Sequence, residues 1–360
     1  MTTISRIRSL WSTHQLLPDE YREFDAHESV TFITDHKTGL RGFIAIHNTN
    51  PGPAVGGTRY WSYSSQEDAL KDALRLSRAM SYKCALANLP YGGGKAVLIA
   101  SKTAPKSDAY FAAYAKRLAT FSGGFYTGED VGLDENDIRT LEKYSGSIIG
   151  RPDVGDLPSH WAARSVQVSM KAAIEAVYGS SSFSGKTVAI KGLGNVGLDL
   201  AKMLSQEGAT IQAADINPAK IEEARAAIPG IQILDVQAIL SSDAEIFAPC
   251  ALGGDLTPQY IETSSAKIVC GAANNQLVSD DAANMLHDRG ILYIPDYVAN
   301  AGGLINVVDE LDPSGYNRAR VEERVHGVGN TVRELIRTSK EKDVSTENVA
   351  GQIARSRIGL

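Results

Sequence analysis

Apolar positions in the first part of the chain follow strand-like and helical patterns in turn. Two apolar runs within residues 28–47 lie on either side of the polar stretch 36–39, which predicts two strands joined by a turn. From Ser65 to Met80, apolar side chains recur at helical spacing, so a helix is expected there. Residues 51–59 are so rich in Gly and Pro that no regular element is expected in them.

A further set of elements is predicted up to about residue 132. The glycines at Gly92–Gly94 predict a turn that leads into a strand over 95–100. Residues 107–121 have helical periodicity, and residues 123–132 predict a loop around a short strand.

Short apolar strands alternate with amphipathic helices after about residue 150. Residues 150–160 have the composition of a linker, and a helix is expected from Trp161 to Tyr178. The strand and helix segments that follow are expected at 186–191, 197–207, 210–215, 218–227 and 243–249. This alternation indicates a parallel, doubly wound sheet with helices on its faces, so the expected fold class is α/β.

Both ends of the chain have helical patterns. Residues 318–340 and 346–357 are amphipathic and no strand follows them, so these helices are expected to dock on another part of the protein. Residues 1–18 contain Arg6 and Arg8, no acidic residue, and apolar side chains on one helical face. This pattern loosely matches an amphipathic transit peptide, and the alternative is an N-terminal helix packed on the domain or on a partner subunit.

Composition narrows the classes of function. The 360 residues are enough for two domains, and 36 basic against 42 acidic side chains give a net charge of −6, which disfavours nucleic acid as a partner. No apolar run is long enough to span a membrane. Cys84, Cys250 and Cys270 are widely spaced, which favours free thiols in a reducing, cytoplasmic compartment. The seven histidines lack the spacing of a metal site, so no metal is expected.

A glycine-rich motif in the second half has the features of a dinucleotide site. Gly192, Gly194 and Gly197 form G-x-G-x-x-G between an apolar strand and the start of a helix. The first glycine permits the turn, the second lets a pyrophosphate approach, and the third lets helix and strand pack closely. The phosphates are then expected at the positive start of the helix, where Asn195 and Val196 lie.

Asp215 ends the next predicted strand after this motif. A carboxylate at that place accepts hydrogen bonds from ribose hydroxyls and repels a 2′-phosphate, so NAD is favoured over NADP as the cofactor. The alternative for the motif is a glycine-rich turn that binds no ligand.

Two lysines and an acid in the first half are candidates for acid–base chemistry. Lys83 ends the helix that begins at Ser65, and Lys95 follows a run of glycines, so both are candidates for burial. Burial and a second nearby cation lower the pKa of a lysine toward the range of a general base. Asp130, in a loop flanked by glycines, is a candidate partner. For each residue alone a solvated surface charge is the alternative.

Long sequence runs, in a fixed order, are similar to those of one enzyme family. The runs are GPAVGGTRYW, DALRLSRAMSYKCALANLPYGGGKAVLI, TGEDVG, KGLGNVG, IFAPCALGG, GAANNQL and LYIPDYVANAGGLINVVDEL. They resemble the leucine/valine/phenylalanine dehydrogenase branch of the Glu/Leu/Phe/Val dehydrogenase family over roughly residues 28–340. The resemblance implies a catalytic and oligomerisation domain (1–155 plus about 330–360) and an NAD-binding Rossmann domain (156–329), with a cleft between them. It also implies C-terminal helices that return to the first domain, and a homo-oligomer.

The same resemblance implies oxidative deamination of an L-amino acid to a 2-keto acid and ammonia, with NAD reduced. It implies that Lys83 holds the substrate carboxylate, that Lys95 activates the attacking water, and that Asp130 binds the amino group and shuttles protons. The other residues that it places against the substrate or the nicotinamide are Gly56, Gly57, Asn275 and Asn300.

The preferred side chain is expected to be apolar, because the sequence has no obvious second set of cations for a side-chain carboxylate. The positions that match the family's side-chain pocket are Val55, Met80, Gly128, Leu304 and Val307. Gly128 and Leu304 are similar to phenylalanine-specific members, whereas Glu129 and the run GAANNQL are similar to leucine and valine members. A mixed preference is therefore expected, since each methylene is worth only about 1–3 kcal/mol of discrimination.

One segment departs from the family's pattern. Relatives carry a Thr before the first long helix of the NAD domain, where this chain has Ala162, preceded by His160 and Trp161. That Thr lies near the nicotinamide in the family. Its loss leaves two alternatives open: an NAD-binding protein that has lost catalysis, or an enzyme that acts on a larger aromatic keto acid.

Overall fold

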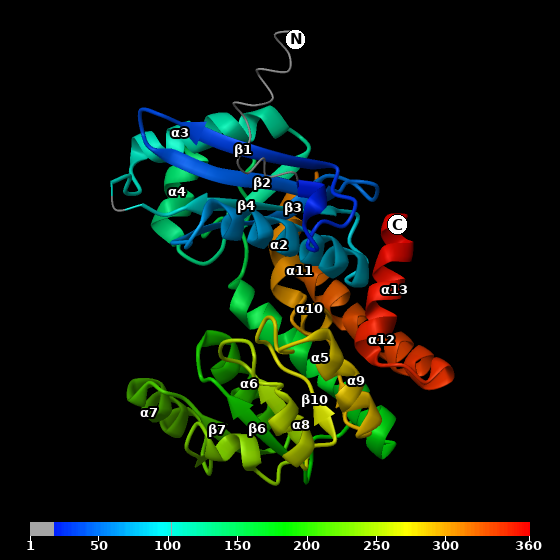
Figure 1. Cartoon of the computed structure of the whole chain (residues 1–360). Coiled ribbons are helices and arrows are strands. Elements are labelled where there is room, and N and C mark those ends of the chain that lie inside the picture. Colours follow the sequence, from blue (N-terminus) through cyan, green and yellow to red (C-terminus); the bar gives the residue numbers. More distant parts are fainter. Residues whose placement is uncertain (1–17, 102) are drawn as a thin grey trace. The chain divides into compact units, whose positions relative to one another are not determined.

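The computed structural model describes residues 18–101 and 103–360, which form two compact units (Figure 1). The first unit contains the chain up to Ser81 together with Tyr91–Ile148. The second unit contains Tyr82–Pro90 together with Ile149–Leu360. The domain bounds expected from the sequence stay a prediction.

The N-terminal segment falls largely beyond what the structure describes. The helix expected in residues 1–18 lies outside the described residues except for Pro18, where the short helix η1 (Pro18–Glu20) begins. Among the described helices, none is both long and apolar enough to cross a membrane.

The first unit is built on a five-stranded mixed sheet in the order β1-β2-β4-β3-β5. Its strands are β1 (Ser29–Asp35), β2 (Leu40–Asn48), β3 (Ala54–Trp61), β4 (Gly92–Ile99) and β5 (Phe125–Glu129). Strand β2 is antiparallel to β1 and β4, whereas β3 is parallel to β4 and β5. The strand pair predicted within residues 28–47 is confirmed, with Phe32 opposite Phe43.

Two glycine-rich segments are strands, contrary to the expectation from the sequence. The prediction of no regular element in residues 51–59 is wrong, because β3 runs through them, and the turn predicted at Gly92–Gly94 is wrong, because β4 begins there. The two backbones approach so closely that a Cβ atom on Gly56 would overlap the carbonyl oxygen of Gly94. Glycine at these positions therefore permits close strand packing instead of a turn.

The helices of the first unit cover both faces of its sheet. They are α2 (Gln66–Leu86, whose last residues belong to the second unit), α3 (Asp108–Leu118), η2 (Ala119–Phe121) and α4 (Glu135–Glu142). Ser65 Oγ accepts a hydrogen bond from the backbone nitrogen of Asp68 at 3.0 Å, which confirms the predicted start of α2.

Strand β4 contributes side chains to two separate apolar clusters. Val97 packs against Leu70 of α2, whereas Leu98 packs in the cluster that contains Tyr110 of α3. Successive residues of a strand point to opposite faces, so Lys95 lies on the same face as Val97. The sheet therefore places Lys95 on the side that α2 covers.

The second unit has a six-stranded sheet in the order β11-β10-β9-β6-β7-β8, with parallel pairings throughout. Its strands are β6 (Thr187–Lys191), β7 (Thr210–Ala214), β8 (Gln232–Ile233), β9 (Ile246–Pro249), β10 (Ile268–Val269) and β11 (Leu292–Tyr293). The chain winds outward from β6 in one direction and from β9 in the other, which confirms the predicted doubly wound sheet. Sheets of this kind bind ligands at the carboxyl ends of the strands where the order reverses.

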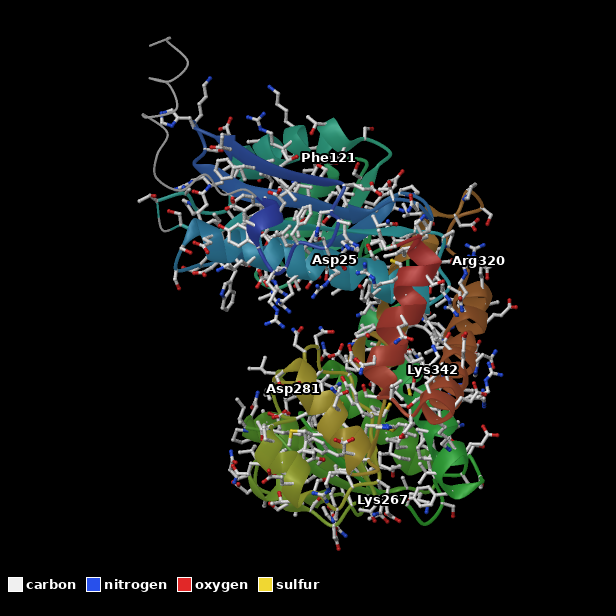
Figure 2. All side chains as sticks on the ribbon, turned by 45° about the vertical axis from the view of Figure 1, so that its right-hand side comes forward. Asp25, Phe121, Lys267, Asp281, Arg320 and Lys342 are labelled. Atoms are coloured by element: carbon white, nitrogen blue, oxygen red, sulfur yellow. The ribbon has the colours of Figure 1, made fainter. Side chains whose placement is uncertain are left out.

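The helices of the second unit include the two C-terminal ones. They are α5 (Pro158–Tyr178), α6 (Asn195–Gln206), α7 (Pro218–Ala227), η3 (Ala238–Ser241), α8 (Pro258–Thr263), α9 (Asp280–Asp288), α10 (Asp296–Ala299), α11 (Gly302–Val308), η4 (Asp309–Leu311), α12 (Arg318–Lys342) and α13 (Thr346–Ile358). Figure 2 labels Arg320 and Lys342 near the two ends of α12, beside which α13 runs.

These C-terminal helices dock on a segment from the first part of the chain. Thr331 Oγ1 of α12 donates to the carbonyl oxygen of Leu86 at 3.1 Å, and Arg357 of α13 donates to that of Ala85 at 3.0 Å. These bonds join the C-terminal helices to the end of α2 within the second unit, and the expected return of the helices to the first domain stays a prediction.

Candidate active site

A buried ion pair joins Lys95 and Asp130 in the first unit. Lys95 lies on β4 and is only 5% exposed, and its Nζ donates to Oδ2 of Asp130, the residue that follows β5. The other carboxylate oxygen, Oδ1, accepts hydrogen bonds from the backbone nitrogen of Val131 at 2.6 Å and from Arg59 at 3.3 Å. Two of the three candidates for acid–base chemistry therefore meet in this unit.

The charges around Asp130 keep its carboxylate ionised. Burial by itself raises the pKa of Asp130, but the positive charges of Lys95 and Arg59 and the hydrogen bonds to the carboxylate outweigh it. The pKa of Asp130 is lowered to about 2. At neutral pH this residue is therefore a hydrogen-bond acceptor, suited to hold a substrate ammonium or a protonated lysine.

The bare backbone of Gly57 packs closely against this ion pair. Strand pairing places Thr58 next to Ala96 on one side and Gly57 next to Gly128 on the other. A Cβ atom on Gly57 would lie 3.1 Å from Lys95 Nζ and 2.9 Å from Asp130 Cβ. A side chain at this position would press on both charged groups, so glycine allows the ion pair to lie directly against β3.

The other residues that the sequence predicted in this unit lie on neighbouring strands or on α2. Gly56 and Val55 are on β3, Gly128 is on β5, and Met80 is on α2. A Cβ atom on Gly56 would come within 3.4 Å of Met80 Cγ. The sheet thus gathers the predicted glycines around Lys95 and Asp130, while their roles toward a substrate stay a prediction.

The sequence argument missed Arg59, which contacts Asp130 directly. Arg59 stands two residues after Gly57 on β3, and strand periodicity therefore places it on the same face of the sheet as Gly57. That spacing was the available signal, but an arginine after a glycine pair is equally typical of a solvated strand end.

The three glycines of the motif lie at the junction of β6 and α6 in the second unit, while their role toward a cofactor stays a prediction. Gly192 has a φ of +103°, and a Cβ atom there would lie 2.7 Å from the nitrogen of Ala251. A Cβ atom on Gly197 would overlap the carbonyl oxygen of Gly192, so only glycine allows helix α6 to pack this closely. A Cβ atom on Gly194 would meet no atom within 4 Å, so the approach to the turn from that side is open.

Helix α6 begins beside this opening. It starts at Asn195, and Gly194, which precedes it, offers no side chain to cap it. The backbone N–H groups of the first turn, which includes Asn195 and Val196, are therefore available to a phosphate. The turn follows β6, next to the point where the strand order reverses. These features fit a dinucleotide pyrophosphate.

Asp215 follows β7 and lies against the same turn. Its carboxylate accepts hydrogen bonds from the backbone nitrogens of Leu193 at 2.6 Å and Asn217 at 2.7 Å. The acid is half-buried and therefore still reachable by a ribose. A fixed negative charge at this place fits NAD better than NADP, as the sequence predicted.

Two asparagines predicted to contact the nicotinamide or substrate also lie in the second unit. Asn275 occupies an exposed turn with a φ of +56°. Asn300 is buried, and its Nδ2 donates to Asn274 Oδ1 at 2.8 Å and to the carbonyl oxygen of Ala272 at 3.0 Å. Its Oδ1 is buried without a hydrogen-bond partner among the described residues, and so presents an acceptor for a ligand's N–H group.

The remaining predicted residues belong to the second unit as well. Lys83 is half-buried in the last turn of α2. Burial raises the pKa of Asp296 above its usual value, and the positive charge of Lys83 partly opposes this rise. Leu304 and Val307 lie three residues apart on α11 and are half-buried apolar side chains. Whether Lys83, Leu304 and Val307 touch a substrate stays a prediction.

The departing segment forms the first turn of α5. Ala162 faces α11, with its Cβ 3.7 Å from the position a Cβ atom would take on Gly303. Trp161 is buried and its Nε1 donates to Asp156 at 3.3 Å, whereas His160 is partly exposed, 3.7 Å from Asp199. The bulky residues of this segment thus pack within the unit.

Comparison with known proteins agrees with this geometry. A family model described as the dimerisation domain of Glu/Leu/Phe/Val dehydrogenase matches residues 27–145, and one described as Glutamate/Leucine/Phenylalanine/Valine dehydrogenase matches residues 217–358. Leucine dehydrogenase from Bacillus cereus is 40% identical to this chain, and the match covers 94% of this chain and 93% of that protein. Phenylalanine dehydrogenase from Caldalkalibacillus thermarum is 39% identical, and the match covers 94% of this chain and 93% of that protein.

A solved structure extends the agreement to the fold. The crystal structure of L-tryptophan dehydrogenase from Nostoc punctiforme is 40% identical, superposes with a TM-score of 0.83, and is matched over 93% of this chain and 96% of that one. The resemblance stated from the sequence motifs is confirmed: the chain belongs to the Glu/Leu/Phe/Val dehydrogenase family, and is an NAD-dependent amino-acid dehydrogenase.

Proposed function

We propose that this protein catalyses the reversible oxidative deamination of an apolar L-amino acid to its 2-keto acid and ammonia, with NAD as the acceptor. The observation that carries the proposal is the ion pair of Lys95 and Asp130 beneath the bare backbone of Gly57. A base and an ionised carboxylate at one position are what addition of water and release of ammonia require.

The Gly192–Gly197 turn would hold NAD⁺, which would supply an acceptor for the hydride of the substrate α-carbon. The substrate is then an iminium ion, to which water adds with loss of a proton. Lys95 Nζ is the acceptor of that proton, and its ammonium faces the ionised Asp130. In the resulting carbinolamine the hydroxyl proton passes to the amino group, the C–N bond breaks to release ammonia, and the 2-keto acid remains. The ammonium of Lys95 stabilises the negative charge that develops on the oxygen during this step.

We assign the recognition of the substrate's ends to different residues. The ammonium of Lys83 pairs with the α-carboxylate, and Asp130 accepts hydrogen bonds from the α-amino group. Met80 and Gly128 of the first unit offer apolar surface for the side chain. The lack of a β-carbon at Gly128 leaves room for a ring, so we propose that aromatic as well as branched aliphatic amino acids are accepted.

A substrate panel tests this function. NADH formation is measured at alkaline pH with leucine, valine, isoleucine, phenylalanine and tryptophan, and with glutamate as the control. At least one apolar substrate is expected to exceed glutamate in kcat/KM by about 10²-fold or more. Activity with glutamate alone, or with none of these amino acids, contradicts the proposal.

Two variants connect that activity to the ion pair. Lys95→Ala and Asp130→Asn are expected to lower kcat by about 10²–10⁴-fold, because each removes one partner in proton transfer. NAD binding, measured by quenching of protein fluorescence, is expected to be unchanged. If NAD binds but no amino acid is turned over by the unmodified protein, the alternative of a family member without catalysis replaces the proposal.

We further propose that the protein is a homo-oligomer in a reducing, cytoplasmic compartment. Strand β1 lies at the edge of its sheet, and Phe32 on this strand is 43% exposed, so a second chain has an apolar strand to cover. The three cysteines are all free thiols, as a reducing compartment favours. Light scattering coupled to size exclusion tests the first part, since a mass equal to one chain contradicts it.

A further inference from the structure

One guanidinium bridges two carboxylates next to the proposed catalytic pair. Arg59 donates from one terminal nitrogen to Asp130 Oδ1 at 3.3 Å, and from the other to Asp72 Oδ2 at 2.9 Å. Asp130 follows β5 and Asp72 lies on α2, so the arginine on β3 ties the end of one strand to the helix that covers the sheet.

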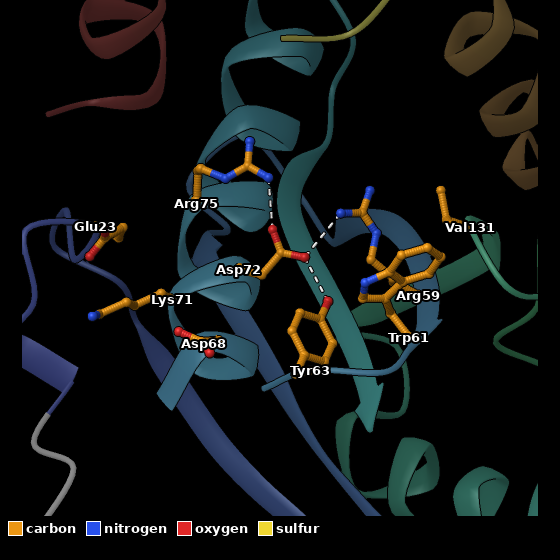
Figure 3. A pocket seen from close by; sticks show the side chains of 9 residues that line it. All are labelled: Glu23, Arg59, Trp61, Tyr63, Asp68, Lys71, Asp72, Arg75 and Val131. Atoms are coloured by element: carbon orange, nitrogen blue, oxygen red, sulfur yellow. Dashed lines mark hydrogen bonds and ion pairs between the residues drawn. The ribbon is translucent and has the colours of Figure 1, made fainter. Parts of the chain in front are cut away.

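Asp72 is itself held in place from two further directions. Tyr63 Oη donates to Asp72 Oδ2 at 2.6 Å, and Arg75 donates to Oδ1 at 2.7 Å, as Figure 3 shows. Burial is the largest influence on the pKa of Asp72 and raises it, but Tyr63, Arg75 and Arg59 outweigh it and lower the pKa. Asp72 therefore remains a charged, fixed anchor for Arg59.

The bridge matters because of what each oxygen of Asp130 does. Oδ2 faces Lys95, whereas Oδ1 is held by the nitrogen of Val131 and by Arg59. With Oδ1 fixed from both sides, the carboxylate cannot rotate away from Lys95. An arginine suits this role because its planar guanidinium donates to two carboxylates from separate nitrogens in a fixed geometry, whereas a lysine has one nitrogen on a flexible stem.

We propose that Arg59, anchored by Asp72, is a positioning residue that holds the Asp130 carboxylate against Lys95. The inference rests on the proposed function, because it assumes that Lys95 and Asp130 carry out the proton transfers. Arg59 acts through Asp130 and not on the substrate itself. Its loss therefore slows the chemistry without weakening the binding of NAD.

The surface on the far side of Arg59 makes this role testable by chemical rescue. Arg59 and Asp72 line a cavity of about 440 Å³ together with Tyr63, Arg75 and Trp61 (Figure 3). The side chain of Arg59 is 20% exposed, and that of Asp72 is 15% exposed. When the side chain of Arg59 is removed, a guanidinium ion from solution can enter through this cavity. It would then occupy the place between the two carboxylates.

The experiment compares Arg59→Ala with Arg59→Lys and with Lys71→Ala. Lys71 lines the same cavity, but its ion pair is with Glu67 on the surface of α2. Arg59→Ala is expected to lower kcat by about 10²-fold, since a misplaced catalytic group costs about that much. The dissociation constant of NAD is expected to stay within threefold of its original value. Arg59→Lys is expected to recover little of the loss, and Lys71→Ala to show none.

Guanidinium chloride at low millimolar concentration is expected to raise the kcat of Arg59→Ala about tenfold, with sodium chloride at equal ionic strength as the control. It is expected not to rescue Lys95→Ala. A kcat for Arg59→Ala within threefold of the unmodified protein, or a loss that guanidinium does not reverse, overturns the inference. If Arg59→Ala does not fold, Arg59→Gln, which retains most of the side chain's packing, is measured in its place. Retained activity in Lys95→Ala and Asp130→Asn would instead overturn the proposed function.

Discussion

The imidazole rings of His27 and His47 lie edge to face in the first unit, with their centroids 4.7 Å apart. Both side chains are buried, and each bonds a serine of α2: His27 Nε2 lies 2.9 Å from Ser77 Oγ, and His47 Nδ1 lies 2.8 Å from Ser81 Oγ. Burial is the main cause that lowers the pKa of both histidines to about 4. The pair is therefore neutral in the folded protein at physiological pH.

This arrangement predicts that the protein loses stability in mild acid. Between pH 6.5 and 4 the unfolded chain binds protons at these histidines while the folded protein does not, so the free energy of unfolding falls as the pH falls. A lowering from 6.5 to about 4 corresponds to up to about 3 kcal/mol for each histidine. Urea unfolding at pH 7 and pH 4.5 measures the change.

The matched control for the histidines is His27→Asn combined with His47→Asn, which removes both imidazoles. The variant is expected to be less stable at pH 7 and to lose less stability on acidification than the unmodified protein. Because the carboxyl groups titrate in both proteins, the difference between their two losses of stability measures the contribution of the histidines alone. Equal losses in the two proteins would contradict the account.

Gly57→Ala is expected to damage activity more than stability. The added methyl group would lie 3.1 Å from Lys95 Nζ and 2.9 Å from Asp130 Cβ, so it displaces the ion pair. A loss in kcat/KM of about 10²-fold or more is expected. The control is Gly327→Ala in the middle of α12, where an added Cβ meets nothing within 4 Å and stability is expected to rise by about 0.5–1 kcal/mol. Steady-state kinetics showing equal effects would refute this account.

The sequence predicted the strand, the glycine turn and the helix of the G-x-G-x-x-G motif well because all of their determinants are local. Gly192, Gly197 and the helix that starts at Asn195 lie within a few residues of one another, so periodicity and motif spacing specify them together. The doubly wound sheet was predictable for the same reason, since each strand is followed closely by its own helix.

The elements that the sequence failed to predict depend on distant partners. Strand β3 has the glycines of a loop and becomes a strand because β4 and β5 pair with it on both sides. The ion pair joins Lys95 to Asp130 only because β3 brings their strands to either side of Gly57, and Arg59 acquires its role from the same pairing. Such contacts carry no local pattern, so the sequence offered the residues as candidates without their geometry.

Two glycines of the motif are expected to separate folding from cofactor binding. Gly197→Ala places a Cβ atom against the carbonyl oxygen of Gly192, which forces α6 away from β6 and should lower the melting temperature. Gly194→Ala meets no protein atom within 4 Å, and its φ of −63° suits alanine, so the melting temperature is expected to be unchanged. The methyl group instead occupies the approach of the pyrophosphate, and the dissociation constant of NAD should rise at least tenfold. Titration of both variants with NAD, together with thermal melting, distinguishes these effects, and normal NAD binding by Gly194→Ala would contradict the assignment of this turn.

Asp215→Ser is expected to weaken the preference for NAD over NADP. The carboxylate of Asp215 is held beside the turn by the nitrogens of Leu193 and Asn217, where a ribose hydroxyl can bond to it and a 2′-phosphate is repelled. Serine removes the negative charge but keeps an oxygen that can accept a hydrogen bond from one of the two nitrogens. The ratio of kcat/KM for NAD to that for NADP is therefore expected to fall by about tenfold or more, because the interaction with NAD weakens and the repulsion of the 2′-phosphate of NADP is removed. Because Asp243 lies elsewhere in the unit and contacts Gln212, Asp243→Ser serves as the control for removing one acidic charge. An unchanged ratio in Asp215→Ser would show that another group selects the cofactor.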